Sequence, residues 1–370
     1  MPTFKELGVR DHFVKALEEI NILAPTEIQE KAIPFLLTKG TDFIGQAQTG
    51  TGKTVAFGLP LLHRIDPDNK QVQALILSPT RELGQQIAKQ LFKFTKYSEK
   101  IFVEAVYGGE KIDRQISALR RPTQIIVATP GRLLDLLERK AVDISHIKTI
   151  VLDEADEMLS MGFKKELDAI LGRTNGKRAT WLFSATMPKE IKQIINTYMA
   201  SDAFKIEVNK KDVVNRSIEH QYVICPEAQK FDFLLHFLKV QKTNRGIIFC
   251  RTKASVQTLT KQLQSKNYPT DAIHGDLMQK ERDKAMRAFK NEKVQILIAT
   301  DISARGIDVQ NLSYVVHYEL PDQLEYYTHR SGRTARAGKK GLSICFIVPQ
   351  EMKKIKEIEQ ELHISFRKIE

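Results

Sequence analysis

Hydrophobic and polar residues alternate along this chain with two different periods. Short apolar runs rich in β-branched residues predict buried strands, and apolar residues that recur every three or four positions predict helices. Residues 148–152 predict one such strand, and residues 11–21 predict an amphipathic helix. Further strands are expected at residues 42–44, 74–78, 102–107, 124–128, 218–225, 246–250, 296–299, 314–318 and 342–348.

This alternation of strands and helices predicts an α/β fold with mainly parallel sheets. Around residues 209–215 the pattern turns polar and loses its period, which is typical of a linker. We therefore expect a domain at residues 1–207, a linker at 208–217 and a second domain at 218–370. A chain of 370 residues with 42% hydrophobic content can bury two cores.

Charge and cysteine content narrow the classes of partner and compartment. The net charge of +12 favours a polyanionic partner without identifying one. Cys225, Cys250 and Cys345 lie far apart in apolar stretches, so buried reduced thiols are expected in place of a zinc site. The sequence shows neither a hydrophobic signal core nor an apolar run of membrane-spanning length, which predicts a cytoplasmic protein without a membrane partner.

A glycine-rich stretch at residues 47–54 reads Ala-Gln-Thr-Gly-Thr-Gly-Lys-Thr, between a short apolar segment and a helix-compatible one. In a phosphate-binding loop, glycines let backbone N–H groups converge on phosphate oxygens, and the helix N-terminus adds partial positive charge. Lys53 would then reach the β and γ phosphates, and the Thr54 hydroxyl would ligate Mg²⁺. Ala47 stands where such loops usually begin with glycine.

Carboxylates follow the strand predicted at residues 148–152. Open α/β sheets bind ligands at the carboxyl ends of their strands, which favours a metal and a water there. Asp153 would hold Mg²⁺ mainly through water, and Glu154 would orient the attacking water. Asp156 is expected to contact other motifs of the site in preference to binding the metal. A capped helix start could also be rich in Asp, but the preceding strand and the upstream loop argue against that alternative.

Together these two motifs resemble those of the DEAD-box RNA helicases of superfamily 2, in which Ala47 is normal. The resemblance continues through nearly the whole chain, although Gly84 and Ala335 stand where Ala and Gly are commoner. It implies two RecA-like domains, each a mainly parallel sheet flanked by helices. It also implies RNA-stimulated hydrolysis of Mg-ATP, coupled to domain closure and to local unwinding of short RNA duplexes or ribonucleoprotein remodelling. The further matching segments are residues 25–29, 79–83, 108–109, 129–132, 184–186, 247–252, 274–282, 299–308 and 329–338.

The resemblance also implies which residues hold ATP. Gln29 would read the adenine edge and Phe4 would stack on its face, although Thr26 and Gln29 also have the spacing of a helix capping box. The expected ATP contacts are Phe4, Thr26, Gln29, Gln48, Thr49, Gly50, Thr51, Gly52, Lys53, Thr54 and Asp308, with Thr54 and Asp153 at Mg²⁺. The expected catalytic residues are Lys53, Asp153, Glu154 and two arginine fingers, Arg333 and Arg336.

Strand ends with hydroxyls, glycines and an arginine suit a sugar-phosphate backbone that is held without reading bases. The RNA contacts implied by the resemblance are Pro79, Thr80, Arg81, Gly109, Thr129, Arg132, Arg251 and Thr300. The residues expected to couple the ATP and RNA sites are Asp156, Ser184, Thr186 and His329. An alternative interpretation makes the segment 329–338 a basic nucleic-acid patch, with which Arg330 is compatible.

Two other functions use the same motifs. An ATP-gated RNA clamp would hold RNA and separate little duplex, and a DNA-acting superfamily 2 motor is a more distant alternative. We expect a monomeric core with ribonucleoprotein or RNA-decay partners. The sequence names neither the RNA nor the partner proteins.

Overall fold

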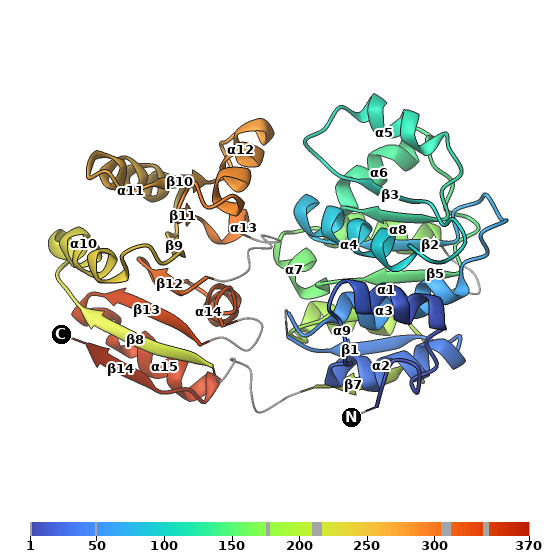
Figure 1. Cartoon of the computed structure of the whole chain (residues 1–370), viewed down its shortest axis with the longest axis horizontal. Coiled ribbons are helices and arrows are strands. Elements are labelled where there is room, and N and C mark those ends of the chain that lie inside the picture. Colours follow the sequence, from blue (N-terminus) through green and yellow to red (C-terminus); the bar gives the residue numbers. More distant parts are fainter. Residues whose placement is uncertain are drawn as a thin grey trace. The chain divides into compact units, whose positions relative to one another are not determined.

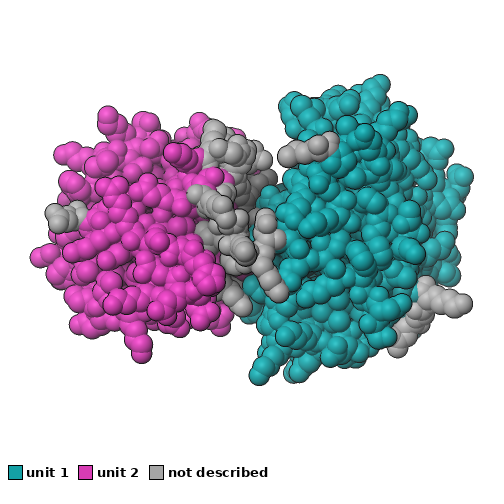
Figure 2. All heavy atoms as spheres, turned by 90° about the horizontal axis from the view of Figure 1, so that it is seen from below, with its two compact units in different colours: residues 1–209 teal, residues 210–370 magenta. Residues whose placement is uncertain are grey.

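The structure of the chain is a computed structural model that describes residues 2–48, 50–174, 178–208, 217–304, 312–335 and 340–369. The chain divides into two compact units, residues 1–209 and 210–370 (Figures 1 and 2). This division falls inside the predicted linker, of which residues 209–216 lie outside the described ranges. The domain boundaries at residues 207 and 218 stay a prediction.

Unit 1 is built on a seven-stranded sheet with the order β3-β4-β2-β5-β6-β1-β7 (Figure 1). All described pairings in it are parallel. The residues of β2, β4, β5 and β6 are all buried, which explains their apolar runs, since strands of a parallel sheet are covered on both faces. The strands are β1 Phe43–Gln46, β2 Ala74–Leu77, β3 Val103–Val106, β4 Ile125–Ala128, β5 Thr149–Leu152, β6 Ala179–Ser184 and β7 Phe204–Glu207.

Two hydrophobic cores lie on the two faces of this sheet. Trp181 and Phe183 of β6 belong to the core that α1 to α4 cover, and Leu182 between them belongs to the core beneath α6 to α9, because side chains alternate along a strand. The helix predicted at residues 11–21 is α1. The helices are α1 Asp11–Glu19, α2 Glu27–Thr38, α3 Lys53–Arg64, α4 Arg81–Phe94, α5 Ile112–Leu119, α6 Pro130–Glu138, α7 Ala155–Ser160, α8 Lys164–Arg173 and α9 Lys189–Tyr198.

Unit 2 contains a second seven-stranded parallel sheet, with the order β10-β11-β9-β12-β13-β8-β14. If the strands are renumbered from one within each unit, both sheets have the same order. The strands are β8 Ile218–Ile224, β9 Gly246–Phe249, β10 Thr270–Ile273, β11 Ile296–Ala299, β12 Tyr314–His317, β13 Gly341–Ile347 and β14 Phe366–Ile369. The helices are α10 Lys230–Gln241, α11 Lys253–Ser265, α12 Gln279–Lys290, α13 Asp301–Ala304, α14 Leu324–Ser331 and α15 Met352–Leu362, with 3₁₀ turns at Glu227–Gln229 and Pro349–Glu351.

These two sheets confirm the predicted α/β class. Cys225, Cys250 and Cys345 are buried free thiols, as expected. Across the described ranges, no helix is both long and apolar enough to cross a membrane.

Candidate functional site

The glycine-rich loop connects β1 to α3, as a phosphate-binding loop requires. Gly50 and Gly52 have φ values of 86° and 89°, in the left-handed region that favours glycine. Lys53 is the first residue of α3; it is buried, and its Nζ donates to the Ala47 carbonyl at 3.0 Å. The Lys53 ammonium group therefore lies against the start of the loop, beside backbone N–H groups at the N-terminus of α3.

The start of α2 is tied to this loop by two side chains. Gln29 accepts from the Thr26 backbone N–H at 3.0 Å, which is the capping-box contact, and its Nε2 donates to the Gly52 carbonyl at 2.9 Å. The Thr26 hydroxyl donates to the Thr51 carbonyl at 2.7 Å. A Cβ on Gly52 would lie 2.2 Å from the Gln29 amide nitrogen, so this close approach also requires glycine.

The structure thus confirms the capping-box interpretation of Gln29. These contacts use one N–H and one lone pair of the Gln29 amide. One N–H and one lone pair are left for a base. Adenine recognition by Gln29 stays a prediction. Phe4 is only 2% exposed and packs in the core with α1. Its ring presents no free face in this structure, so stacking on adenine would require the segment before α1 to move, and it also stays a prediction.

The carboxylates lie where β5 ends, on the same sheet edge as the loop. The Asp153 N–H donates to the Leu77 carbonyl of β2 at 2.9 Å, so Asp153 extends the strand pairing by one residue. Its carboxyl group is buried, and burial raises its pKa although the Lys53 ammonium acts to lower it; the neighbouring Glu154 and Asp156 raise it further. A buried carboxylate that is short of positive charge is a suitable ligand for a divalent cation.

Glu154 has an unusual backbone conformation. With φ 51° and ψ 52° it lies in the left-handed region, although it carries a side chain, and its N–H donates to Asp153 Oδ1 at 3.0 Å. Such backbone strain costs energy and clusters at functional sites. Strand β5 thus ends in a left-handed turn at Glu154, which is buried and directly precedes α7.

Asp156 connects these carboxylates to the segment after β6. Its Oδ2 accepts from both the backbone N–H and the hydroxyl of Thr186, at 2.8 Å each. The Asp156 N–H donates to the Ser184 hydroxyl, whose own hydrogen goes to the Thr186 carbonyl at 2.7 Å. The structure therefore brings together three of the residues predicted to couple the sites; the coupling itself stays a prediction.

The RNA contacts predicted in unit 1 share the other half of the same sheet edge. The order β3-β4-β2-β5 places the ends of β2, β3 and β4 side by side, next to Asp153. These ends carry Pro79, Thr80 and Arg81 after β2, Gly109 after β3, and Thr129 and Arg132 after β4. They offer hydroxyls, two guanidinium groups and a glycine, as backbone binding requires.

Side chains absent from the sequence prediction hold two of these arginines. The Arg81 guanidinium lies 4.6 Å from the centre of the Tyr107 ring, and Gln85 donates to the Tyr107 hydroxyl at 2.7 Å. Arg132 donates to Gln115 Oε1 at 2.8 Å. These partners come from α4, α5 and the residue directly after β3, and their only sequence signal is position: Gln85 lies one helical turn after Arg81.

In unit 2, Arg251 and Thr300 follow the neighbouring strands β9 and β11, and Arg333 follows α14. Arg251 is exposed and lies 3.4 Å from Asp322, and the Thr300 hydroxyl lies 2.7 Å from that of Ser303. Arg333 donates to the His329 carbonyl at 3.2 Å. Thr49 of unit 1 and two residues of unit 2, Asp308 and Arg336, lie outside the described ranges.

Arg330 requires a correction. It is 1% exposed and forms two charge-assisted hydrogen bonds to Asp301, at 2.5 and 2.7 Å, and a third to the Glu319 carbonyl. Its guanidinium also packs 5.1 Å from the centre of the Phe249 ring. A buried, bidentate arginine holds α14 against α13 and β9 and is not available to nucleic acid, so the basic-patch interpretation of Arg330 is wrong.

Comparison with known proteins identifies the architecture. Residues 26–194 match the DEAD/DEAH box helicase family and residues 229–338 match the helicase conserved C-terminal domain. The chain is 45% identical to the ATP-dependent RNA helicase CshA of Listeria monocytogenes over 360 residues, which are 97% of this chain and 69% of that protein. It is also 45% identical to the CshA of Limosilactobacillus reuteri, over 96% of this chain and 71% of that one.

The chain belongs to the DEAD-box helicase family.

Solved structures of DEAD-box proteins agree with this assignment. S. cerevisiae Dbp5 bound to RNA and ADP BeF3 is 32% identical, with a TM-score of 0.92, and the match covers 100% of this chain and 96% of Dbp5. The DEAD-box helicase Mss116 bound to ssRNA and UDP-BeF is 30% identical, with a TM-score of 0.91 and coverage of 100% and 81%. The two RecA-like domains expected from the sequence are therefore present.

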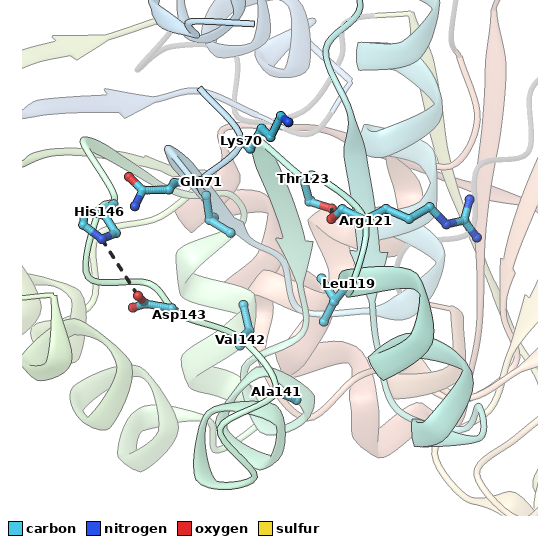
Figure 3. Close-up of a pocket in the computed structure, with 10 residues that line it drawn as sticks. Lys70, Gln71, Leu119, Arg121, Thr123, Ala141, Val142, Asp143 and His146 are labelled. Atoms are coloured by element: carbon cyan, nitrogen blue, oxygen red, sulfur yellow. Dashed lines mark hydrogen bonds and ion pairs between the residues drawn. The ribbon is translucent and has the colours of Figure 1, made fainter. Parts of the chain in front are cut away.

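A cavity in unit 1 lies away from this DEAD-box edge. It has a volume of about 190 Å³, and its lining includes Lys70, Thr123 and His146 (Figure 3). These residues precede β2, β4 and β5, so the cavity is at the amino ends of the strands, opposite the motifs. His146 Nε2 lies 4.0 Å from an Asp143 carboxylate oxygen there, and both side chains are largely exposed. The cavity takes no part in the ATP site.

Proposed function

We propose that this protein is an ATP-dependent RNA helicase whose Mg-ATP hydrolysis is stimulated by RNA. The observation that carries the proposal is one sheet edge in unit 1 that holds the phosphate loop and the carboxylates beside the RNA-type strand ends. Asp156 and Thr186 are hydrogen bonded next to the carboxylates. The relatives named CshA support the RNA and ATP assignment, as do the Dbp5 and Mss116 structures that contain RNA and a nucleotide analogue.

The ATP half would work through four side chains. Lys53 would bind the β and γ phosphates, and Thr54 and Asp153 would hold Mg²⁺, Asp153 mainly through water. When bound, Mg²⁺ would neutralise charge on the phosphates. A cation beside Asp153 would also relieve the cost of its buried negative charge. Glu154, at the left-handed turn, would orient the attacking water, and the fixed backbone there limits where its carboxylate can reach.

Unit 2 would complete the reaction. Arg333 and Arg336 would place positive charge on the transferred phosphoryl group when ATP and RNA bring the two domains together. Arg251 and Thr300 would then hold the same RNA strand as Thr80 and its neighbours. Bending of that strand would open a short duplex, and hydrolysis would release it. Gln29 would select adenine within this scheme.

Strand displacement tests the proposal. A short RNA duplex with a single-stranded overhang should be separated with ATP and not with a non-hydrolysable analogue. Retention of RNA with the analogue, together with almost no displacement in ATP, would instead identify an ATP-gated clamp. Displacement of the matching DNA duplex at the same rate would identify a DNA-acting motor.

The proposal extends to the cellular setting. A cytoplasmic location, a monomeric core and ribonucleoprotein or RNA-decay partners fit a general RNA helicase. Cell fractionation, the mass of the purified protein in solution and co-purification after ribonuclease treatment test these three points separately.

A further inference from the structure

The exposed face of α4 carries a row of polar, cationic and aromatic side chains of which the proposed function uses only the first, Arg81. Arg81, Gln85, Lys89, Phe92 and Lys96 recur every three or four residues and therefore lie along one stripe of the helix and its last turn. Lys89 and Lys96 are exposed, and Phe92 is 74% exposed. The row begins at Arg81, a predicted RNA contact, and runs toward the opposite edge of the sheet. We call these residues, with Lys93 beside Phe92, the α4 stripe.

More aromatic rings and lysines lie where the stripe ends, next to α1 (Figure 1). Tyr97 is 39% exposed, and the Nζ atoms of Lys15 and Lys96 lie 4.3 and 5.3 Å from its ring centre. Phe102 is 42% exposed, with Lys100 Nζ at 5.8 Å. The end of the α4 stripe is therefore flanked by two further exposed aromatic rings, Tyr97 and Phe102, each with a lysine ammonium within 6 Å of its centre.

Three of these exposed lysines form no ion pair with a described side chain. Lys96 pairs with Glu19 of α1, but none of the described side chains forms an ion pair with Lys89, Lys93 or Lys100. Exposed lysines with interspersed aromatic rings are the chemistry that binds single-stranded nucleic acid: the lysines contact phosphates, and the rings stack on unpaired bases. A surface for an apolar protein partner would not need this charge.

We propose that the α4 stripe binds single-stranded RNA that continues beyond the contacts at the carboxyl edge of the sheet. This inference rests on the proposed function, because the RNA path must reach Arg81 first. From Arg81 to Phe94 the helix rises about 20 Å, enough for several nucleotides of an extended strand. Phe92 is the stacking platform, and Lys89 and Lys93 neutralise phosphates on either side of it.

RNA affinity as a function of length tests this proposal. Anisotropy titrations with a non-hydrolysable ATP analogue would compare a short core oligonucleotide with the same core extended at its 5′ end or at its 3′ end. One of the extensions should tighten binding about fivefold or more, and Phe92→Ala should remove most of that gain. The double variant Lys89→Gln with Lys93→Gln should also lower the salt dependence of log K for the extended RNA by about 1.4.

A matched control removes the same charge from the other face of the sheet. Lys165→Gln with Lys192→Gln, on α8 and α9, should leave the gain from extension unchanged. Thermal unfolding of each variant checks the fold, which the exposed position of Phe92 should preserve.

Three results would overturn the α4 stripe as an RNA site. These are equal affinity for core and extended RNA in the unmodified protein, equal losses in the control and stripe variants, and binding of a poly-glutamate peptide at the stripe without any gain from RNA extension. Stimulation of ATP hydrolysis by the core oligonucleotide separates the two proposals. If that stimulation is present and the gain is absent, only the α4 stripe is refuted; if the stimulation is absent, the proposed function itself fails.

Discussion

The two units share one strand order, so each position at the carboxyl edge of the first sheet has a counterpart in the second. Thr80 and Thr252 each come three residues after equivalent strands and accept a hydrogen bond from the backbone N–H three residues later. Thr129 and Thr300 each follow the next strand of their sheet directly. On the half of the edge that we assign to RNA, these two threonine hydroxyls of unit 1 therefore have counterparts in unit 2.

The half that we assign to ATP is not repeated. Lys53 and Lys230 both begin the helix after the equivalent strand, but Lys53 follows a glycine loop and Lys230 follows residues 226–229, without glycine. Glu227 lies 3.1 Å from the Lys230 ammonium. In unit 2 a carboxylate therefore pairs with the ammonium group that would otherwise be available to bind a phosphate. Where Asp153 follows β5, Tyr318 follows β12. The proposed RNA-backbone edge therefore has a counterpart in unit 2, and the proposed phosphate site has none among the described residues.

The largest effect should come from the water-orienting carboxylate. Glu154→Gln should lower RNA-stimulated turnover at least about a hundredfold while ATP and RNA still bind, because the amide cannot polarise the water. The counterpart Glu319→Gln should leave turnover near that of the unmodified protein, since Gln can still accept from Arg251 N–H. Steady-state phosphate release measures both, and equal losses would break the comparison.

Substitutions of Lys53 and of its counterpart Lys230 should differ almost as strongly in their effect on ATP binding. Lys53→Met should weaken ATP binding by about tenfold to a hundredfold, the range for one lost hydrogen bond to a charged group. Lys230→Met should leave ATP affinity unchanged, because its ammonium is already paired with Glu227. Titration with a fluorescent ATP analogue measures both affinities. Weaker nucleotide binding in the Lys230 variant would place phosphate in unit 2 as well.

The repeated half predicts matched, smaller effects. Thr129→Val and Thr300→Val should each weaken binding of single-stranded RNA by about two- to tenfold, the range for one neutral hydrogen bond. Both titrations should be made with the same oligonucleotide and a non-hydrolysable ATP analogue. A loss in one variant and none in the other would show that the two edges do not hold the same strand.

The smallest effect concerns stability. Burial raises the pKa of Asp153. At pH values above this raised pKa, the folded protein carries an unfavourable buried charge. The cost to stability disappears at pH values below the pKa that Asp153 has in the unfolded chain. Without Mg²⁺ and ATP, Asp153→Asn should therefore stabilise unit 1 by roughly 1–3 kcal/mol, more at about pH 8 than at about pH 5. Urea unfolding followed by Trp181, the single tryptophan, reports on unit 1. A destabilised variant at the higher pH would contradict the assignment.

Most central strands could be predicted from the sequence, and most edge strands could not. Strands β2, β4, β5, β9, β11 and β12 are buried throughout, so their residues form unbroken apolar runs. Among the strands that were not predicted, β7, β10 and β14 lie at sheet edges and include half-buried or exposed residues. Two strands depart from this trend: the edge strand β3 was predicted at residues 102–107, and the buried central strand β6 was not predicted. Edge strands lack neighbours on one side, which weakens the hydrophobic signal.

Site residues within one motif were predictable, and contacts between elements were not. The Gly-Lys-Thr and Asp-Glu spacings are local and stand in the sequence itself. The support of Arg81 by Tyr107, which directly follows the edge strand β3, depends on the folded sheet. The burial of Arg330, which excludes it from the alternative basic patch, was not visible in the sequence for the same reason, because its partner Asp301 lies 29 residues earlier and meets it only in the folded unit. Charge alone could not separate a buried arginine from an RNA contact.

Phosphate release from ATP with and without single-stranded RNA, in the unmodified protein and in Glu154→Gln, tests the central claim most directly. The account predicts hydrolysis that RNA stimulates and that vanishes in the variant, because the proposed ATP site and the proposed RNA contacts of unit 1 share one sheet edge. Hydrolysis that RNA leaves unchanged, or that persists in Glu154→Gln, would contradict it.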